Sequence, residues 1–287
     1  MQYEAPTTVS AALDLLSNAT GECRVMAGGT DLLVRLRAEM SEPDLIVDIK
    51  RIEGMRDIVA EDGGWRIGAA VSGAEMSEHD TLGKDWPGVV EGMDLIGSTQ
   101  VQGRATLAGN LCNASPAADS VPAMAAANAI ARVAGQNGTR DVPVADIPAG
   151  PGKTTLTKDE FITSIFLPAR GERASDAYLR FIPRTEMDIA VVGCGVSLTL
   201  DADGTITDAN VSLGAVAPTV IVVDAAAKAL TGTKLDEAAL EALAAACSEA
   251  ATPISDKRGT VEFRKHVSGV LAQRAAKIAY QRAGGAS

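Results

Sequence analysis

The stretch from Thr106 to Asp119 reads TLAGNLCNASPAAD, and it governs how the rest of the chain is interpreted. It lies between an apolar run and an alanine-rich helical run, where a strand would lead into a helix. Thr106, Asn110 and Asn113 supply hydroxyl and amide groups, while Gly109 keeps the surface low enough for a flat or extended ligand. The stretch, called the second loop below, therefore predicts one wall of a ligand site.

A first glycine-centred loop lies near the start of the chain, where residues 27–33 read AGGTDLL after a short β-prone run. Gly28 and Gly29 lack a Cβ atom, so they can adopt positive φ and let an anionic oxygen approach the main chain. Thr30 or Asp31 would then cap the following helix. Taken alone, a glycine pair also suits an ordinary strand-to-helix turn. Two such loops together predict one long, doubly charged ligand held by backbone N–H groups.

Two roles fit Asp119 from the sequence. Its carboxylate can cap the alanine-rich helix that follows, or it can accept hydrogen bonds from ribose hydroxyls. Neither loop contains the GxxxxGK[ST] lysine of a nucleoside-triphosphate P-loop, and neither matches GxGxxG. These absences exclude a kinase-type P-loop and a Rossmann dinucleotide site.

Composition limits the class of protein. The chain has 287 residues, of which 46% are hydrophobic, so two or three domains with substantial cores are expected. A formal net charge of −11 argues against nucleic acid as a partner. No stretch reaches the roughly 18 to 20 apolar residues of a membrane span, and the N-terminus lacks the pattern of a signal peptide. We therefore expect a soluble, cytoplasmic protein.

Apolar periodicity divides the chain into three parts. Residues 1–55 have the pattern of a small α/β lobe, with a first helix capped by Thr8. Residues 56–172 alternate strands with Ala-rich helices and predict a second α/β lobe. A charged, breaker-containing link at 168–175 leads into residues 173–287. The ligand is expected between the first two lobes, since cofactor sites are common at domain junctions.

The third part, residues 173–287, has a different pattern of predicted strands and helices. Residues 189–200 and 206–216 are β-rich runs around a turn at 201–204, which is the pattern of an antiparallel hairpin. Residues 236–250 and 261–283 have helical spacing. This part is therefore predicted to be an α+β domain, and the chain as a whole to belong to the α+β class.

These motifs together resemble a known family. AGGTDLL and TLAGNLCNASPAAD are similar to the two FAD-binding segments of the medium, flavoprotein subunit of molybdenum hydroxylases, a group that includes aerobic carbon monoxide dehydrogenase and the FAD domain of xanthine dehydrogenase. Residues 178–190 resemble the family's Y-x-K/R…R-x-x-x-D-I-A segment, and residues 253–264 (PISDKRGTVEFR) resemble its C-terminal signature. The resemblance covers essentially the whole chain in the same order.

The resemblance implies that FAD binds noncovalently to a two-lobed, PCMH-like domain that precedes a C-terminal α+β domain. The first loop would wrap the pyrophosphate through main-chain N–H groups, and the second would lie beside the pyrophosphate and flavin. Asp119 would lie at the ribose or its neighbourhood, with apolar Ile162 and basic Arg180 near the isoalloxazine. The plain alternative for Arg180 is a solvated charge on a strand. The implied cofactor-binding residues are Val25, Met26, Ala27, Gly28, Gly29, Thr30, Asp31, Leu32, Thr106, Gly109, Asn110, Asn113, Asp119, Ile162 and Arg180.

The cysteines and histidines show no pattern of a metal or catalytic site. The four cysteines lack CxxC or other ligand spacing, so neither zinc nor an iron–sulfur cluster is expected in this chain. We expect buried free thiols, and we expect Cys112 to be a packed thiol rather than a flavin attachment point. His79 and His266 lie outside both loops, which favours surface or structural roles. No catalytic residue is predicted.

The function that the resemblance implies is electron transfer within a heterotrimer, often paired into a dimer of heterotrimers. A large subunit would oxidise the substrate at a molybdenum cofactor, a small subunit would relay electrons through 2Fe-2S clusters, and FAD would pass them to an external acceptor. Two alternatives stay open: a self-sufficient FAD-dependent oxidoreductase of the same fold, and a cofactor-free scaffold subunit. The sequence leaves the reducing substrate and the electron acceptor open.

Overall fold

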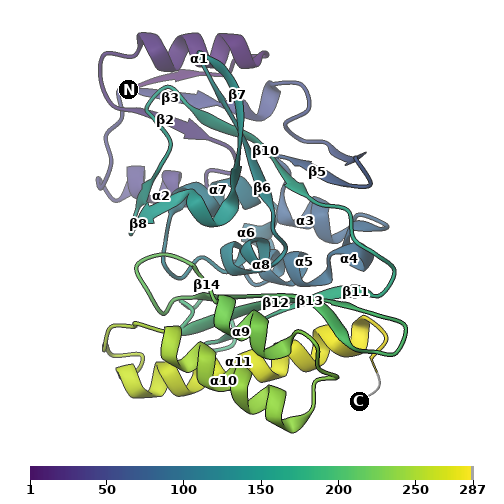
Figure 1. Cartoon of the computed structure of the whole chain (residues 1–287). Coiled ribbons are helices and arrows are strands. Elements are labelled where there is room, and N and C mark those ends of the chain that lie inside the picture. The colour runs from purple at the N-terminus through teal and green to yellow at the C-terminus, as the bar shows by residue number, and fades with distance from the viewer. Residues whose placement is uncertain (286–287) are drawn as a thin grey trace.

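In a computed structural model, residues 1–285 are described and form three main sheets that lie one above another (Figure 1). The N-terminal sheet is parallel, and the two larger sheets are antiparallel. Helices lie between the second and third sheets and again beyond the third. No helix within the described residues is long and apolar enough to cross a lipid bilayer.

The N-terminal lobe is a three-stranded sheet in the order β1-β3-β2. Its elements are β1 (Gln2–Glu4), α1 (Val9–Asn18), β2 (Cys23–Met26), α2 (Leu32–Arg37), β3 (Leu45–Asp48) and the 3-10 turn η1 (Ile49–Arg51). The predicted cap of α1 is confirmed, because the Thr8 side chain accepts a hydrogen bond of 3.2 Å from the N–H of Ala11. All four residues of the central strand β3 are buried, which explains the run LIV before its terminal Asp48.

The second lobe has a five-stranded antiparallel sheet in the order β4-β5-β10-β6-β7. Its strands are β4 (Ile58–Glu61), β5 (Gly64–Gly68), β6 (Ile130–Gly135), β7 (Gly138–Pro143) and β10 (Phe161–Leu167). Its helices are α3 (Gly73–Ser77), α4 (Leu82–Asp85), α5 (Pro87–Asp94), α6 (Thr99–Gln102), α7 (Leu107–Asn113) and α8 (Ser120–Ala126). The turn η2 (Val144–Asp146) and the hairpin β8 (Pro148–Gly150) and β9 (Lys153–Thr154) precede β10.

The order of elements in this lobe differs from the predicted alternation of strands and helices. The six helices follow one another between β5 and β6, and β10 returns to pair with both of these strands. Periodicity indicates which segments are strands, but the pairing of β10 depends on contacts far apart in sequence. The predicted α+β class is confirmed for the chain as a whole. The sheet of this lobe, however, is antiparallel, and it is not built from alternating strands and helices as an α/β lobe would be.

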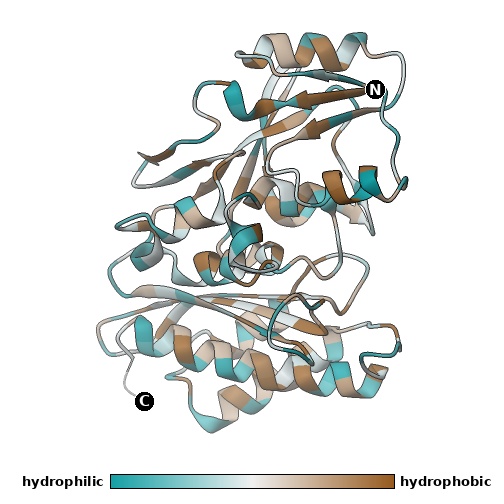
Figure 2. Cartoon of the chain, turned by 180° about the vertical axis from the view of Figure 1, so that it is seen from behind, coloured by the Kyte–Doolittle hydropathy of each residue, from teal (hydrophilic) through white to brown (hydrophobic). Residues whose placement is uncertain are grey.

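The C-terminal part is a four-stranded antiparallel sheet covered by three helices. The elements are β11 (Ala174–Phe181), β12 (Val192–Leu200), β13 (Ile206–Gly214), β14 (Ile221–Val222), α9 (Asp224–Leu230), α10 (Glu237–Ala250) and α11 (Val261–Arg282). The predicted hairpin is confirmed by the pairing of β12 with β13, and both predicted helices are present. Hydrophobic and hydrophilic residues alternate along these outer helices, as expected of helices with one buried face (Figure 2).

The opposite face of the C-terminal sheet packs against α5 and α8 of the second lobe. Gly195 on β12 permits this close approach, since a Cβ there would lie 2.6 Å from the carbonyl oxygen of Pro122. The buried carboxylate of Asp176 on β11 accepts a hydrogen bond of 3.1 Å from the N–H of Val89 on α5. The sheet is therefore covered on both faces, and the second loop, which contains α7 and leads into α8, ends close to this junction.

Candidate cofactor-binding site

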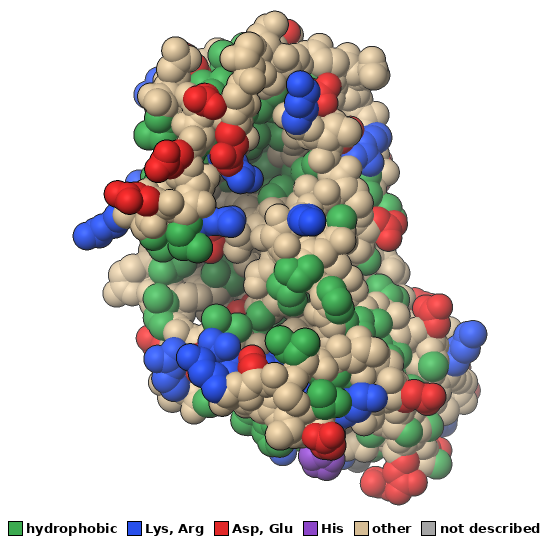
Figure 3. Space-filling model, turned by 90° about the vertical axis from the view of Figure 1, so that its left-hand side faces the viewer, with side chains coloured by type: hydrophobic (Ala, Val, Ile, Leu, Met, Phe, Trp, Pro, Cys, Tyr) green, Lys and Arg blue, Asp and Glu red, His purple; other side chains and the backbone are tan. Residues whose placement is uncertain are grey.

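A cleft of about 300 Å³ opens between the N-terminal lobe and the second lobe. Figure 3 shows the side of the molecule on which the surface is hollowed. The walls come from β2 and the first loop on one side, and from α7 and β10 on the other. This volume lies at the lower end of the range for ligand sites, and an extended ligand would reach out of it.

The first loop presents a run of free backbone donors to this cleft. Gly29 has φ +77°, which confirms the predicted positive φ at this residue. The N–H groups of residues 28–32 donate to no acceptor among residues 1–285, and all five residues line the cleft. Successive free N–H groups around a left-handed glycine form a concave site for an anion.

Gly28 has a different role from the one predicted. It does not adopt positive φ, and a Cβ atom on it would lie 1.8 Å from the carbonyl oxygen of Arg104. Glycine is therefore required because the main chain just before the second loop touches the first loop at this point. The predicted cap is also wrong for Asp31, which precedes α2 without making a side-chain cap hydrogen bond.

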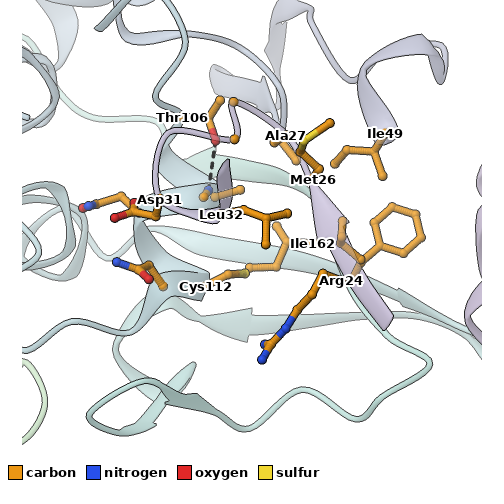
Figure 4. A pocket seen from close by; sticks show the side chains of 18 of the residues that line it. Arg24, Met26, Ala27, Asp31, Leu32, Ile49, Thr106, Cys112 and Ile162 are labelled. Atoms are coloured by element: carbon orange, nitrogen blue, oxygen red, sulfur yellow. Dashed lines mark hydrogen bonds between the residues drawn. The ribbon is translucent and has the colours of Figure 1, made fainter. Parts of the chain in front are cut away.

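The second loop begins with a capped helix. Thr106 Oγ1 accepts a hydrogen bond of 2.9 Å from the N–H of Gly109, drawn in Figure 4 as a dashed line. Asn110 Oδ1 accepts a hydrogen bond of 2.7 Å from the hydroxyl of Ser120, which ties α7 to α8. A Cβ on Gly109 would lie 2.9 Å from Thr106 Oγ1. Gly109 therefore protects the cap as well as keeping the cleft open.

Apolar side chains form part of the cleft wall, as Figure 4 shows for Met26, Leu32 and Ile162. Charged side chains also line it, namely those of Arg24, Arg35, Lys158 and Glu160. Cys112 also lines the cleft and is exposed, so the expectation of a packed thiol is wrong at this position. Cys194 and Cys247 are the buried free thiols that were expected. The apolar part of the wall suits a flat aromatic ring, and the cationic side chains suit a charged part of the same ligand.

Asp119 and Arg180 lie outside this lining and pair with each other at the junction of α8 and β11. Arg180 Nη1 is 2.7 Å from Asp119 Oδ2, and the Tyr178 hydroxyl donates to Asp119 Oδ1 at 3.1 Å. The Arg180 and Asp119 side chains are only 5% and 9% exposed. The plain alternative of a solvated Arg180 is therefore wrong, and so is a capping role for the Asp119 carboxylate.

Burial dominates the electrostatics of this pair. It raises the pKa of Asp119 to about 6, although Arg180 and Tyr178 both favour the carboxylate. Arg180 Nε is buried and has no hydrogen-bond partner among residues 1–285. A buried donor without an acceptor is costly, and a ligand extending from the cleft toward the C-terminal domain can supply one.

The remaining predicted residues all line the cleft: Val25, Met26, Ala27, Gly28, Gly29, Thr30, Asp31, Leu32, Thr106, Gly109, Asn110, Asn113 and Ile162. The sequence interpretation missed the hairpin β8–β9, which contributes Gly152 and Thr154 to the wall. The N–H of Gly152 donates at 2.9 Å to the carbonyl of Ala114, so the hairpin reaches the site through a tertiary contact. In the sequence, the glycines of this hairpin indicate a turn, but they do not indicate that the turn lines the cleft.

These features fit a dinucleotide with a pyrophosphate and a flat ring system. The free N–H groups suit the charged phosphates, the apolar wall suits the rings, and the orphaned Arg180 Nε lies beyond one end of the second loop. Residues 1–170 match the family described as "FAD binding domain in molybdopterin dehydrogenase". The chain belongs to this family. Residues 177–279 match the "CO dehydrogenase flavoprotein C-terminal domain", so the two matches follow each other along the chain.

The similarity to known members of the family extends over nearly the whole chain. The chain is 30% identical over 285 residues to a putative xanthine dehydrogenase FAD-binding subunit of Escherichia coli, covering 99% of this chain and 97% of that one. It superposes on a chain of the Cu,Mo-CO dehydrogenase with a TM-score of 0.93 and 30% identity, covering 98% of both chains. Quinoline 2-oxidoreductase from Pseudomonas putida gives 0.90 at 25% identity, with 99% and 98% covered.

The comparisons confirm four predictions made from the sequence. The chain is of the medium, FAD-binding subunit type of molybdenum hydroxylases, and FAD is the ligand that the family description names. The relatives are subunits of dehydrogenases and oxidoreductases, in agreement with the predicted enzyme class. The α+β architecture is shared with these structures.

Proposed function

We propose that this chain binds FAD noncovalently in the cleft and acts as the electron-exit subunit of a molybdenum hydroxylase. The observation that carries the proposal is the run of free N–H groups at residues 28–32, which faces α7 across the cleft. Main-chain donors are suited to this task because the chain has a net charge of −11, which repels an anionic cofactor at long range.

Each part of the site has a separate task in this proposal. The first loop would hold the pyrophosphate, the second loop would hold the pyrophosphate and part of the flavin, and Ile162 would pack near the rings. Arg180 and Asp119 would lie toward the flavin end. FAD, when bound, supplies the conversion between two-electron and one-electron transfer. The protein contributes position, polarity and access, and no side chain needs to act as an acid or base.

The proposed partners are a large molybdenum-cofactor subunit and a small iron–sulfur subunit, in a cytoplasmic dimer of heterotrimers. The relatives' names support an assembly of several chains, since they speak of a subunit or a medium chain. Co-expression with the neighbouring large and small subunit genes would test this proposal. We expect one complex with bound flavin that substrate reduces, whereas the isolated chain should show no substrate turnover. Turnover by the isolated chain would support the self-sufficient oxidoreductase instead.

FAD binding itself is tested on the isolated chain by titrating apo-protein with FAD and following flavin fluorescence. We expect saturation at one FAD per chain, with ADP competing. Gly29→Val and Gly109→Val should sharply lower FAD content, because the added side chains fill the approach to the loops. Gly232→Val is the control for Gly29, since Gly232 also has positive φ, at +84°, but lies on the surface of the C-terminal domain. Equal FAD content in all the variants would contradict the proposed site.

A further inference from the structure

A chain of hydrogen bonds behind the first loop connects it to the N-terminal sheet. Lys50 Nζ donates to the carbonyl oxygen of Ala27 at 2.9 Å and to Asp48 Oδ2 at 2.7 Å. The same Asp48 oxygen accepts a hydrogen bond of 2.5 Å from the Tyr3 hydroxyl. Of these four residues, Ala27 alone is in the lining of the cleft within the described part of the chain.

The topology of the N-terminal sheet brings these groups together. β1 and β2 both pair in parallel with β3, so the C-terminal ends of all three strands meet at one edge. Asp48 ends β3 opposite Met26, and Ala27 follows directly. The Asp48 carboxylate also accepts a hydrogen bond of 3.0 Å from the N–H of Lys50. This bond caps the turn η1 and folds Lys50 back toward the end of β2.

The contact with Ala27 fixes the peptide group that opens the first loop. A trans peptide is planar, and its C=O and N–H point in opposite directions. With the Ala27 carbonyl held by Lys50, the N–H of Gly28 must point away from Lys50. That N–H is the first of the free donors that line the cleft. On its other side Gly28 is confined by the Arg104 carbonyl, so the orientation is fixed from two directions.

The charges show that Lys50 acts as a local donor rather than as a free cation. Its ammonium group pairs with Asp48, whose side chain is only 6% exposed, while that of Lys50 is 26% exposed. The carboxylate thus offsets the lysine charge, and the Tyr3 hydroxyl donates to the same carboxylate oxygen. Tyr3 is 56% exposed, so only the carboxylate at the centre of this network is buried, and its hydrogen bonds to Lys50 and Tyr3 hold the lysine in one arrangement.

We propose that Lys50 is a positioning residue for the cofactor: through the Ala27 carbonyl it sets the backbone donors of the first loop toward the pyrophosphate. This inference rests on the proposed binding of FAD in the cleft. Lys50 touches the protein and not the cofactor, and Asp48 and Tyr3 hold Lys50 in place. A short segment just after β3 thereby controls a loop more than 20 residues earlier in the chain.

The test uses the full-length apo-protein with FAD and ADP as probes, since both contain the pyrophosphate. Lys50→Met should raise the Kd for FAD and for ADP by a similar factor, about 10-fold to 100-fold, which is the range for loss of a hydrogen bond to a charged group. Lys50→Arg, which keeps a cationic donor, should bind FAD more tightly than Lys50→Met does. Lys228→Met changes an exposed lysine on α9 and should leave both Kd values unchanged.

Thermal unfolding of the apo-protein separates positioning from a purely structural role. Lys50→Met leaves the Asp48 carboxylate without its charged partner and should lower the melting temperature. The double variant Asp48→Asn/Lys50→Met removes that charge as well and should melt close to the wild type, while its Kd values for FAD and ADP stay raised. Tyr3→Phe keeps the contact of Lys50 with Ala27 and should have a smaller effect on FAD binding in the same direction. Wild-type affinity in Lys50→Met, or no rescue by Lys50→Arg, would overturn the inference. Absence of FAD binding by the wild-type chain would instead overturn the proposed function.

Discussion

The two loops of the cleft are built in opposite ways. The first loop offers backbone N–H groups, and the helix that follows it, α2, has no buried residue. The second loop is tied into the protein by side chains: Thr106 caps α7, Asn110 bonds Ser120, and Asp119 pairs with Arg180 of the C-terminal sheet. One loop is thus open toward a ligand, and the other joins the domains.

This difference predicts how the two loops respond to substitution. Changes in the first loop should act mainly on cofactor binding, since few other contacts depend on its backbone. Changes in the second loop should act on both folding and binding, because buried polar groups lose their partners. The following predictions test this contrast, beginning with the largest expected effect.

Arg180→Met should destabilise the protein by about 3 to 5 kcal/mol, because it leaves the Asp119 carboxylate buried without its charged partner. Denaturant unfolding of the apo-protein measures this effect. Arg56→Met is the control, since the Arg56 side chain is 57% exposed and that of its partner Glu75 is 36% exposed. Similar stability of the two variants would show that the buried pair does not tie the second loop to the C-terminal sheet.

Part of the pH dependence of the free energy of unfolding should come from the Asp119 carboxyl. Burial raises the pKa of this carboxyl from 3.8 to about 6, so the folded state holds the proton more tightly than the unfolded chain. The free energy of unfolding should therefore fall as pH rises from about 4 to 6, by up to about 3 kcal/mol from this group. In Asp119→Asn this component should be absent. A difference between variant and wild type that stays constant from pH 4 to 7 would contradict the assignment.

The two glycines of the first loop should differ in their effect on folding. Gly28→Ala places a Cβ against the Arg104 carbonyl and should cost more stability than Gly29→Ala, about 2 to 3 kcal/mol. Gly29→Ala imposes left-handed strain of about 1 to 2 kcal/mol, and Gly232→Ala should impose similar strain elsewhere. FAD affinity should fall in both loop variants and not in Gly232→Ala. Chemical denaturation measures the free energy of unfolding of each variant. A larger loss in Gly29→Ala than in Gly28→Ala would refute the contact between the two loops.

Two threonine caps give the smallest and most closely matched comparison. Thr106→Val removes the cap of α7 and Thr8→Val removes that of α1, and each should lower the free energy of unfolding by about 1 kcal/mol. FAD affinity should fall in Thr106→Val only, because the first turn of α7 lines the cleft. Titration of both apo-proteins with FAD checks this, and equal affinities would remove Thr106 from the site.

Much of the site could be predicted because it is encoded in short, contiguous motifs. The first loop lines the cleft as predicted, with positive φ at Gly29. The environments of Gly28 and Cys112 could not be predicted, because they depend on which distant backbone lies alongside. The exposure of Cys112 follows from the gap between two lobes. The requirement for glycine at position 28 follows from a carbonyl 76 residues later in the chain.

The sequence by itself determined the element types, the glycine turns and the family, because local periodicity and backbone freedom are properties of contiguous residues. Only the tertiary structure decided that Asp119 pairs with Arg180, that β10 lies in the middle of its sheet, and that Lys50 holds Ala27. These contacts join segments separated by many residues, so they depend on how the chain folds, and the polar ones are favoured because a buried polar group without a partner is costly.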